Sequence, residues 1–355
     1  MKLRLYSLAR LLGGFDLARF LSRGQLGILC YHGFSLHDEH QFRPKLFITA
    51  DHFAARLDWL RRNRYIALPI EEAHQRLTSG RLGARELVLT IDDGFHGVHA
   101  IAAPLLEAAG FTATIYVTTY YVQHQNPVFR LAVQYLFWRT ARHDADLDGL
   151  APGLGCCTTR GAAAEAAIDR LVAHGETALD EAGRVALATE LGRRLAVDYA
   201  ALQADRRLTL MSEAQIADLA ARGFDIQLHT HRHRLPDDDA LVAREIEDNR
   251  KVLERLSGRP ARHLCYPSGL WSTRAWPALR CAGVLTATTC EPDLNPSGRP
   301  PLALTRFLDF QDTPDIVFEA EVAGFGQLAR RAAGRRQAAA GSPAEGPQAA
   351  GAAPT

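Results

Sequence analysis

The chain has 355 residues, of which 47% are hydrophobic and 23% are charged, a composition that is typical of a globular protein and excludes disorder of the whole chain. The 41 basic and 40 acidic residues leave a formal charge of +1. This balance, without a basic stripe interleaved with aromatic residues, argues against nucleic acid as a partner. The six cysteines form no Cys-x-x-Cys pair, and their spacing favours a reducing compartment over a disulfide framework.

Residues 1–24 are predicted to form an amphipathic, basic helix. Charged residues interrupt this apolar stretch too often for a secretory signal peptide or a membrane span. Two interpretations stay open, because such a helix either packs against its own domain or rests on a membrane surface. We therefore expect a cytoplasmic protein, located at the inner face of the membrane if the second interpretation holds.

From residue 25 onward, short apolar runs alternate with helical patterns, which is typical of β/α units around a parallel sheet. The sequence therefore predicts an α/β fold, a distorted (β/α) barrel. The charged residues of the helix at 239–257, including Glu245, are expected to form a solvated face. Strands are predicted at 27–32, 87–91, 112–119, 224–228, 263–266, 284–289 and 303–307, and helices at 51–63, 97–109, 212–222 and 239–257.

Two regions depart from this alternation. Residues 123–207 are largely helical and rich in alanine, so they are predicted to be a helical insertion between two parts of the barrel, 25–122 and 208–329. Residues 330–355 are small and polar and lack core-forming side chains, which predicts a disordered C-terminal tail.

Two adjacent carboxylates, Asp92 and Asp93, stand at the end of the apolar strand predicted at 87–91, and Gly94 follows them. Burying two acids at a strand end is costly without a purpose, and in a β/α barrel this end faces the active-site mouth. A helix N-cap would explain one aspartate. The pair favours catalysis.

A histidine pair, His229 and His233, follows the strand predicted at 224–228. Residues four apart share a face and are able to bind one metal ion, although incidental polar surface is the alternative. Two imidazoles and one carboxylate make a three-ligand site that keeps positions open for water. Because the strand ends of a barrel meet at one mouth, we expect Asp93 and this pair to come together.

These residues resemble the motifs of a known family. The segments TIDDG at 90–94 and HTHRH at 229–233 are similar to the T-F-D-D-G and H-[ST]-x-x-H motifs of the polysaccharide deacetylases, the NodB-homology group of carbohydrate esterase family 4. The opening Tyr31-His32-Gly33 resembles the start of many bacterial members, and RHLCYPSG at 262–269 occupies the place of the third motif. The resemblance covers roughly residues 25–122 and 208–310 and implies a distorted (β/α) barrel.

The resemblance implies a role for each matched residue. Asp93, His229 and His233 would hold a divalent metal ion, with Zn²⁺ expected, and Asp92 would act as the general base toward water whose pKa the metal lowers. The backbone N–H of Ser268 would stabilise the oxyanion. The implied substrate is an N-acetylated amino sugar in a polysaccharide or a lipid-linked glycan.

The sequence departs from the family pattern at two places. The third motif normally carries an arginine that holds the base; counted back from Gly269, that place is taken by His263, with Arg262 before it. The late Leu-x-His, which supplies the general acid in many members, has no counterpart in the segment 302–306. We expect the leaving amine to be protonated by His32, ahead of His263 or a metal-coordinated water.

Three alternatives to a deacetylase stay open. A deformylase of a lipid-linked sugar would use the same chemistry on another substrate. A non-haem Fe(II) oxygenase uses the same ligand set but needs only one acid, so the spare Asp92 favours hydrolysis. A catalytically silent, metal-binding factor of glycan assembly is compatible with the missing late histidine.

Overall fold

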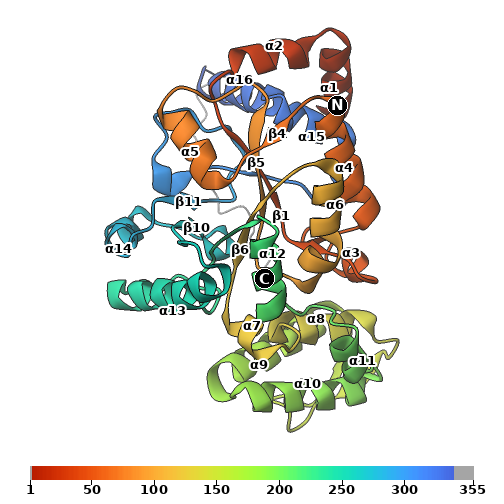
Figure 1. Cartoon of the computed structure of the whole chain (residues 1–355). Coiled ribbons are helices and arrows are strands. Elements are labelled where there is room, and N and C mark those ends of the chain that lie inside the picture. Colours follow the sequence, from red (N-terminus) through yellow and green to blue (C-terminus); the bar gives the residue numbers. More distant parts are fainter. Residues whose placement is uncertain (1, 340–355) are drawn as a thin grey trace.

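In the computed structural model, which describes residues 2–339, eight strands form a parallel sheet that curls into a distorted barrel (Figure 1). The strand order is β11-β10-β9-β6-β5-β1-β12, and β4 pairs with the start of β5. Leu304 forms a parallel bridge to Thr288 of β11 just before β12 begins, so the sheet curls back toward its first strand. The predicted distorted (β/α) barrel is confirmed.

The predicted strands are all present, although 303–307 is shifted, and the two-residue strand β4 was missed. A parallel sheet is covered by helices on its outside, so its central strands are largely buried; β5 buries every residue except Glu86. The strand bounds are β1 Gly27–Tyr31, β4 Ile66–Ala67, β5 Glu86–Ile91, β6 Thr114–Val117, β9 Asp225–Leu228, β10 His263–Cys265, β11 Thr286–Thr288 and β12 Phe307–Leu308.

The four predicted helices also form, and local signals fix their starts. In α4, the Thr49 side chain caps the first turn, and Phe53, Leu57 and Leu60 share the buried face. In α12, Ser212 and Gln215 form a capping box. The helices that surround the sheet are α4 Ala50–Arg62, α5 Ile70–Thr78, α6 Ala103–Ala109, which continues the π-helical turn at Val98–Ala102, α12 Glu213–Ala221, α13 Asp239–Ser257 and α14 Trp276–Cys281.

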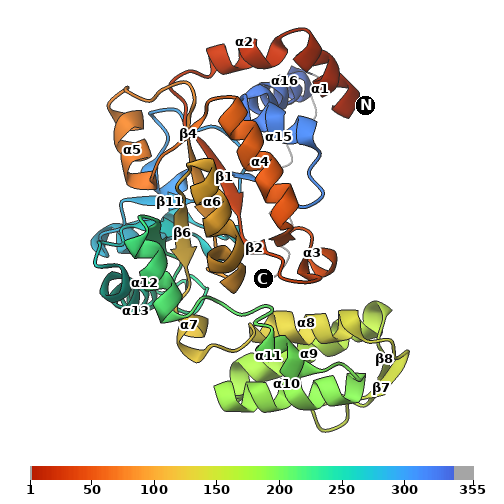
Figure 2. The ribbon, with the colours of Figure 1, turned by 45° about the vertical axis from the view of Figure 1, so that its right-hand side comes forward.

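The region between β6 and β9 forms a helical lobe beside the carboxyl ends of the strands (Figure 2). One buried cluster joins its apolar side chains to those of the barrel. Within the lobe, α9 comes so close to α8 that a Cβ on Gly175 would lie 2.2 Å from the Phe129 ring. The elements are α7 Tyr120–His124, α8 Phe129–Arg139, a hairpin of β7 Asp144–Asp146 and β8 Cys156–Thr158, α9 Gly161–Ala178, α10 Glu181–Leu195 and α11 Tyr199–Ala204.

The N-terminal segment forms two helices, α1 Lys2–Leu11 and α2 Gly14–Leu21, instead of the single predicted helix. They meet at Gly13, whose φ of +75° is one that glycine adopts without a steric penalty. Both pack on α15 Asp315–Val322 and α16 Phe325–Ala339.

The C-terminal helix α16 runs to Ala339. Residues 330–339, which the sequence predicted to be part of a disordered tail, are therefore helical. The rest of that predicted tail, 340–355, lies outside the described residues. Among the helices of residues 2–339, none combines the length and the apolar character that crossing a membrane requires.

The close packing around Gly97, four residues after Asp93, leaves no room for a side chain. A Cβ on Gly97 would lie 2.2 Å from the carbonyl oxygen of Phe34, so we expect Gly97→Ala to lower the free energy of unfolding by about 1–3 kcal/mol. Denaturant unfolding measures this, with Gly155→Ala as the control because its Cβ would meet nothing within 4 Å. Equal stability of the two variants would contradict the packing described here.

Candidate active site

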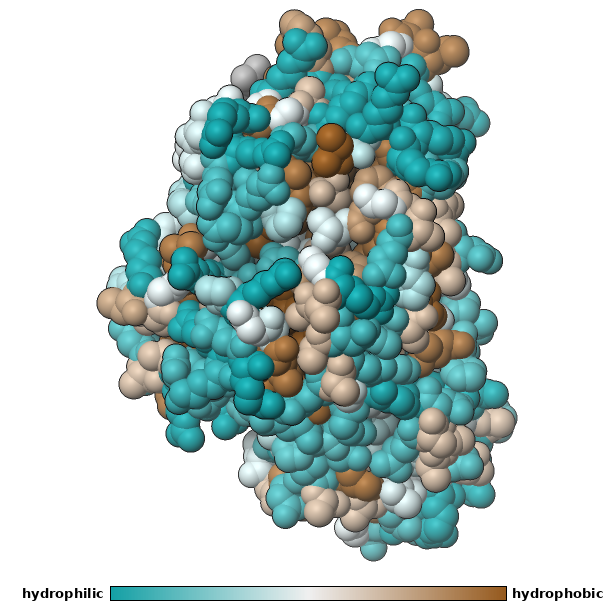
Figure 3. Space-filling view, in the orientation of Figure 1, coloured by the Kyte–Doolittle hydropathy of each residue, from teal (hydrophilic) through white to brown (hydrophobic). Residues whose placement is uncertain are grey.

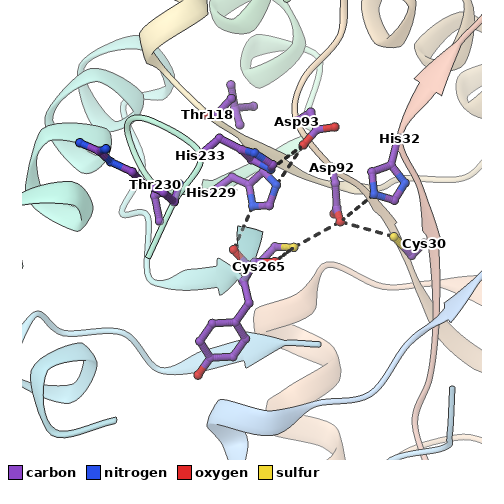
Figure 4. Close-up of polar contacts among 12 residues, drawn as sticks. Cys30, His32, Asp92, Asp93, Thr118, His229, Thr230, His233 and Cys265 are labelled. Carbon is purple, nitrogen blue, oxygen red and sulfur yellow. Dashed lines mark hydrogen bonds and ion pairs between the residues drawn. The ribbon is translucent and has the colours of Figure 1, made fainter. Parts of the chain in front are cut away.

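The strand ends bring the two acidic and two basic motif residues to one place. Asp92 and Asp93 follow β5, and His229 follows β9, with only β6 between these strands in the sheet. The chain leaves β5 in a left-handed turn, with φ of +66° at Asp93 and +87° at Gly94. After this turn Asp93 lies beside His229 and His233, whereas the Asp92 carboxylate points toward His32, Cys30 and Cys265 (Figure 4).

Asp93 lies against both predicted histidine ligands. Its Oδ1 atom is 3.1 Å from Nε2 of His229 and 3.3 Å from Nε2 of His233, and the three donor atoms lie within 4.8 Å of one another. The other ring nitrogen of His229, Nδ1, donates to the carbonyl oxygen of Cys265 at 2.9 Å. That bond places a proton on Nδ1 and makes Nε2, which lies beside Asp93, the nitrogen available to a metal ion, as in metal-binding histidines. The residues present therefore fit a divalent ion.

The loop that carries the two histidines, residues 229–234 (the histidine loop), is held by hydrogen bonds within the loop and to α13. Thr230 and His233 adopt positive φ angles, +61° and +54°, and the Thr230 hydroxyl accepts the N–H of Arg234 at 3.0 Å. The buried Asn249 of α13 accepts the N–H of His229 at 2.9 Å. Thr230 thus orients the loop, and Asn249 is a supporting residue that no local sequence pattern indicated.

Glu245 corrects one expectation. It was expected on a solvated helix face but is only 4% exposed, because its carboxylate accepts both the backbone N–H and the guanidinium of Arg232, each at 2.8 Å. Glu245 and Asn249 are four residues apart and so share one face of α13. This face anchors the histidine loop.

Asp92 is held by a buried ion pair. Its Oδ1 and Oδ2 atoms accept two N–H groups of Arg306 at 2.7 and 2.8 Å, and the thiols of Cys265 and Cys30 lie 3.2 and 3.5 Å from Oδ2. Burial alone would raise the pKa of Asp92, but the positive charges of Arg306 and His32 hold it well below its ordinary value. The carboxylate therefore stays ionised.

The arginine that holds the base comes from an unexpected segment. His263, at the first position of β10, is bonded through its ring to Glu71 of α5 at 2.8 Å, away from Asp92, and Arg262 is exposed. Neither residue therefore holds the base, and His263, bonded to Glu71, lies away from the place of a general acid. The base is held instead by Arg306, which follows the apolar run 302–304; a fully buried guanidinium there requires a carboxylate partner.

Of the remaining predicted residues, His32 lies beside Asp92 and Ser268 lies on the groove. His32 Nε2 is 3.6 Å from Asp92 Oδ2; burial lowers its pKa below the ordinary value, although the charge of Asp92 opposes this shift. Ser268 adopts a left-handed conformation, φ +56°, in the turn Pro267–Gly269. It lines a groove together with Asp93 and His233.

This groove, of about 580 Å³, runs between the barrel mouth and the helical lobe. The lobe side carries two supported arginines: Arg184 donates to the Tyr120 hydroxyl at 3.2 Å, and Arg130 pairs with Glu176 at 2.9 Å. A cleft of this size with aromatic and polar walls is typical of a ligand site. It is lined by Asp93, Phe95, Thr118, Tyr120, Tyr121, Val128, Arg130, Leu131, Glu176, Arg184, Leu210, Arg232, His233, Arg234 and Ser268.

Within residues 2–339, two other groups of donors converge closely enough to hold a metal: Cys30–His32–Asp92 and Asp92–His229–Cys265. Both would need Asp92 as a ligand. Because Arg306 already occupies both oxygens of Asp92, the group Asp93–His229–His233 fits a metal ion best.

Comparison with known proteins gives one match in sequence and several in structure. The polysaccharide deacetylase family model matches residues 190–287, a segment that contains the histidine loop and the CYPSG turn. Among curated proteins, no sequence relative matches. The resemblance to the polysaccharide deacetylases that the motifs indicated is confirmed.

Three solved structures illustrate the shared fold. The Streptococcus pyogenes deacetylase PplD, in complex with acetate, is 15% identical with a TM-score of 0.56, over 84% of this chain and 98% of that one. A de-N-acetylase from Aggregatibacter actinomycetemcomitans is 14% identical with a TM-score of 0.54, over 84% and 99%. IcaB from Ammonifex degensii is 18% identical with a TM-score of 0.51, over 84% and 97%. Identities this low show the fold alone.

The ion pair at the base is testable by substitution. Arg306→Met leaves the buried Asp92 carboxylate without its cation, so we expect the free energy of unfolding at neutral pH to fall by about 3–5 kcal/mol. Denaturant unfolding measures this, and the exposed Arg262→Met is the control, with a change of about 0.5 kcal/mol or less.

The same pair predicts a pH dependence. In the wild type the folded pKa of Asp92 is lowered, so its stabilising contribution is present above its unfolded pKa of about 3.9 and is lost as the pH falls below it. In Arg306→Met, burial alone would raise that pKa, so the stability gap should widen as the pH rises from 4 to 7. A gap that does not change with pH would contradict the pairing.

Proposed function

We propose that this chain, which resembles the polysaccharide deacetylases in sequence and fold, removes acetyl groups from N-acetylated amino sugars of a glycan by metal-dependent hydrolysis. The observation that carries the proposal is the difference between two adjacent aspartates. Asp92 is held as an ionised base by Arg306, whereas Asp93 faces two imidazoles. Hydrolysis uses both a base and a metal ligand, whereas an Fe(II) oxygenase needs only the ligand.

Asp93, His229 and His233 would hold the ion, and two imidazoles with one carboxylate suit Zn²⁺. When bound, the ion lowers the pKa of a coordinated water and polarises the amide carbonyl. The backbone N–H of Ser268, on the turn that lines the groove, is proposed to donate to the oxyanion. PplD was solved with acetate, which is the small product that such a reaction releases.

Asp92 and His32 carry the proton in this proposal. Asp92 takes a proton from the attacking water and passes it on, which restores the carboxylate beside Arg306. His32 Nε2, 3.6 Å from Asp92 Oδ2, is the base placed to receive it. The imidazolium then protonates the leaving amine, so His32 takes the role of the late histidine that the sequence lacks.

The groove supports a glycan substrate longer than one sugar. It continues from Asp93 along the lobe, where Tyr120 and Tyr121 offer aromatic rings and Arg184 offers hydrogen-bond donors. Aromatic rings and fixed polar groups are the elements from which ligand sites of this kind are built. We propose that the helical insertion forms one wall of the substrate site. The predicted cytoplasmic location stays a prediction.

Two variants separate the base from the ligands. Asp92→Asn should reduce acetyl release by about 10²–10⁴-fold and keep the metal content, whereas His233→Gln should lose both. Mass spectrometry of N-acetylated oligosaccharides and elemental analysis measure these quantities, with the exposed His143→Gln as control. Wild-type rates in Asp92→Asn would contradict its role as base. A metal-loaded wild type that releases no acetate from any oligosaccharide would contradict the proposed function.

The role of His32 predicts a dependence on the leaving group. His32→Gln should slow N-acetyl hydrolysis by about 10²–10⁴-fold, because an amine must be protonated as it leaves. Hydrolysis of 4-nitrophenyl acetate should fall much less, since a phenolate leaves without a proton. Equal losses on amide and ester, or no loss on either, would show that His32 is not the acid.

A further inference from the structure

The first two helices carry most of the exposed large hydrophobic side chains. In the described part of the chain, thirteen such side chains are exposed, and eight of them belong to α1, α2 and the turn between them. They lie at the edge of the molecule where brown residues protrude in Figure 3, over the helices labelled α1 and α2 in Figure 1. They are Leu3, Leu5, Leu8, Leu11, Leu12, Leu17, Phe20 and Leu21, exposed by 46% to 82%.

Each helix is apolar on two faces. The inner faces bury Tyr6 and Phe15 against α15 and α16, which accounts for packing on the chain's own domain. The outer faces repeat the pattern, with Leu5, Leu8 and Leu12 at i, i+3 and i+7 on α1 and its end. On α2, the three residues at 17, 20 and 21 follow at i, i+3 and i+4. Packing on the domain therefore leaves the outer faces without a partner in the described chain.

Basic residues accompany this surface. Residues 1–24 contain five basic residues and one acidic residue, a net charge of +4, whereas the whole chain carries only +1. Arg4 and Arg23 are exposed beside the leucines, and the Arg23 guanidinium lies 4.4 Å from the centre of the Phe20 ring. An apolar face bordered by cations is complementary to a surface with an apolar interior and anionic head groups.

We propose that the outer face of α1 and α2 docks on an anionic lipid surface. The leucines would enter the boundary between head groups and acyl chains, and the arginines would pair with phosphates. A second copy of the chain is the other candidate occupant. A symmetric contact would bring Arg4 and Arg23 of both copies into one apolar interface, where the one acidic residue of the segment, Asp16, is already paired with Arg19; the excess of cations is unfavourable. In this arrangement α1 and α2 would lie along the lipid surface, with their inner faces still packed on α15 and α16.

Docking in this way would turn the candidate active site away from the lipid. The α1 and α2 helices lie at the end of the barrel where strands begin, since β1 starts at Gly27 directly after α2, and the lobe lies at the other end (Figures 1 and 2). The six residues of β5 at ~3.3 Å each and one helix diameter of ~10 Å put the mouth about 30 Å from the docking face. This inference rests on the proposed function. The separation favours a substrate glycan that extends into solvent, and disfavours a sugar that lies among the lipid head groups.

The test is co-sedimentation of the full chain with phosphatidylcholine vesicles, prepared with and without phosphatidylglycerol. The wild type should sediment with the anionic vesicles, and Leu8→Glu/Leu17→Glu should reduce the affinity at least ten-fold. Leu241→Glu/Leu285→Glu, at exposed leucines elsewhere, should bind as the wild type does. Thermal unfolding and metal content should be equal in all three proteins, which separates loss of docking from loss of fold.

Failure of the wild type to bind anionic vesicles, or unchanged binding by Leu8→Glu/Leu17→Glu, would overturn the proposal. A dimer in solution that this variant converts to a monomer would assign the face to a second copy instead. Sedimentation needs no turnover, so an inactive protein that binds would contradict only the proposed function. A protein that hydrolyses soluble oligosaccharides when free but not on vesicles would contradict the orientation.

Discussion

The ion pair between Asp92 and Arg306 is the interaction on which the rest of the site depends. Two adjacent carboxylates would otherwise compete for the same ion and repel each other across the turn after β5. Because both oxygens of Asp92 are occupied by one guanidinium, only Asp93 remains directed at the imidazoles of His229 and His233. Two residues of one type thus acquire different roles from their surroundings, one as an ionised base and the other as a ligand.

Residues of the barrel strands and of α13 fix the positions of the site side chains. Cys265, at the end of β10, fixes the His229 ring through its carbonyl group and approaches Asp92 through its thiol, so one residue contacts both halves of the site. Helix α13 holds the histidine loop through Asn249 and Glu245. The aspartates, the histidine loop and Cys265 are thus each positioned by a strand end or a helix face. The helical lobe contributes one wall of the groove beside them.

Much of the fold and the outline of the site could be predicted from sequence, because alternating apolar runs and adjacent motif residues are local signals. The strands, the helices and the meeting of Asp93 with the histidines follow from that alternation and from parallel topology. Arg306 and Glu245 could not be assigned in this way, since their partners lie 214 and 13 residues away and only the folded chain shows which charges are buried. The break between α1 and α2 has a local sequence signal, because two adjacent glycines, Gly13 and Gly14, interrupt the apolar helical pattern there.

The most direct test of this division of roles is X-ray absorption spectroscopy of the zinc-loaded protein. The account predicts nitrogen and oxygen neighbours only, at about 2.0–2.2 Å, with the multiple-scattering pattern of two imidazoles. A sulfur neighbour at about 2.3 Å would contradict it, because Cys30 or Cys265 joins the site only in the groups that use Asp92 as a ligand. In that case Arg306 would have to release the carboxylate.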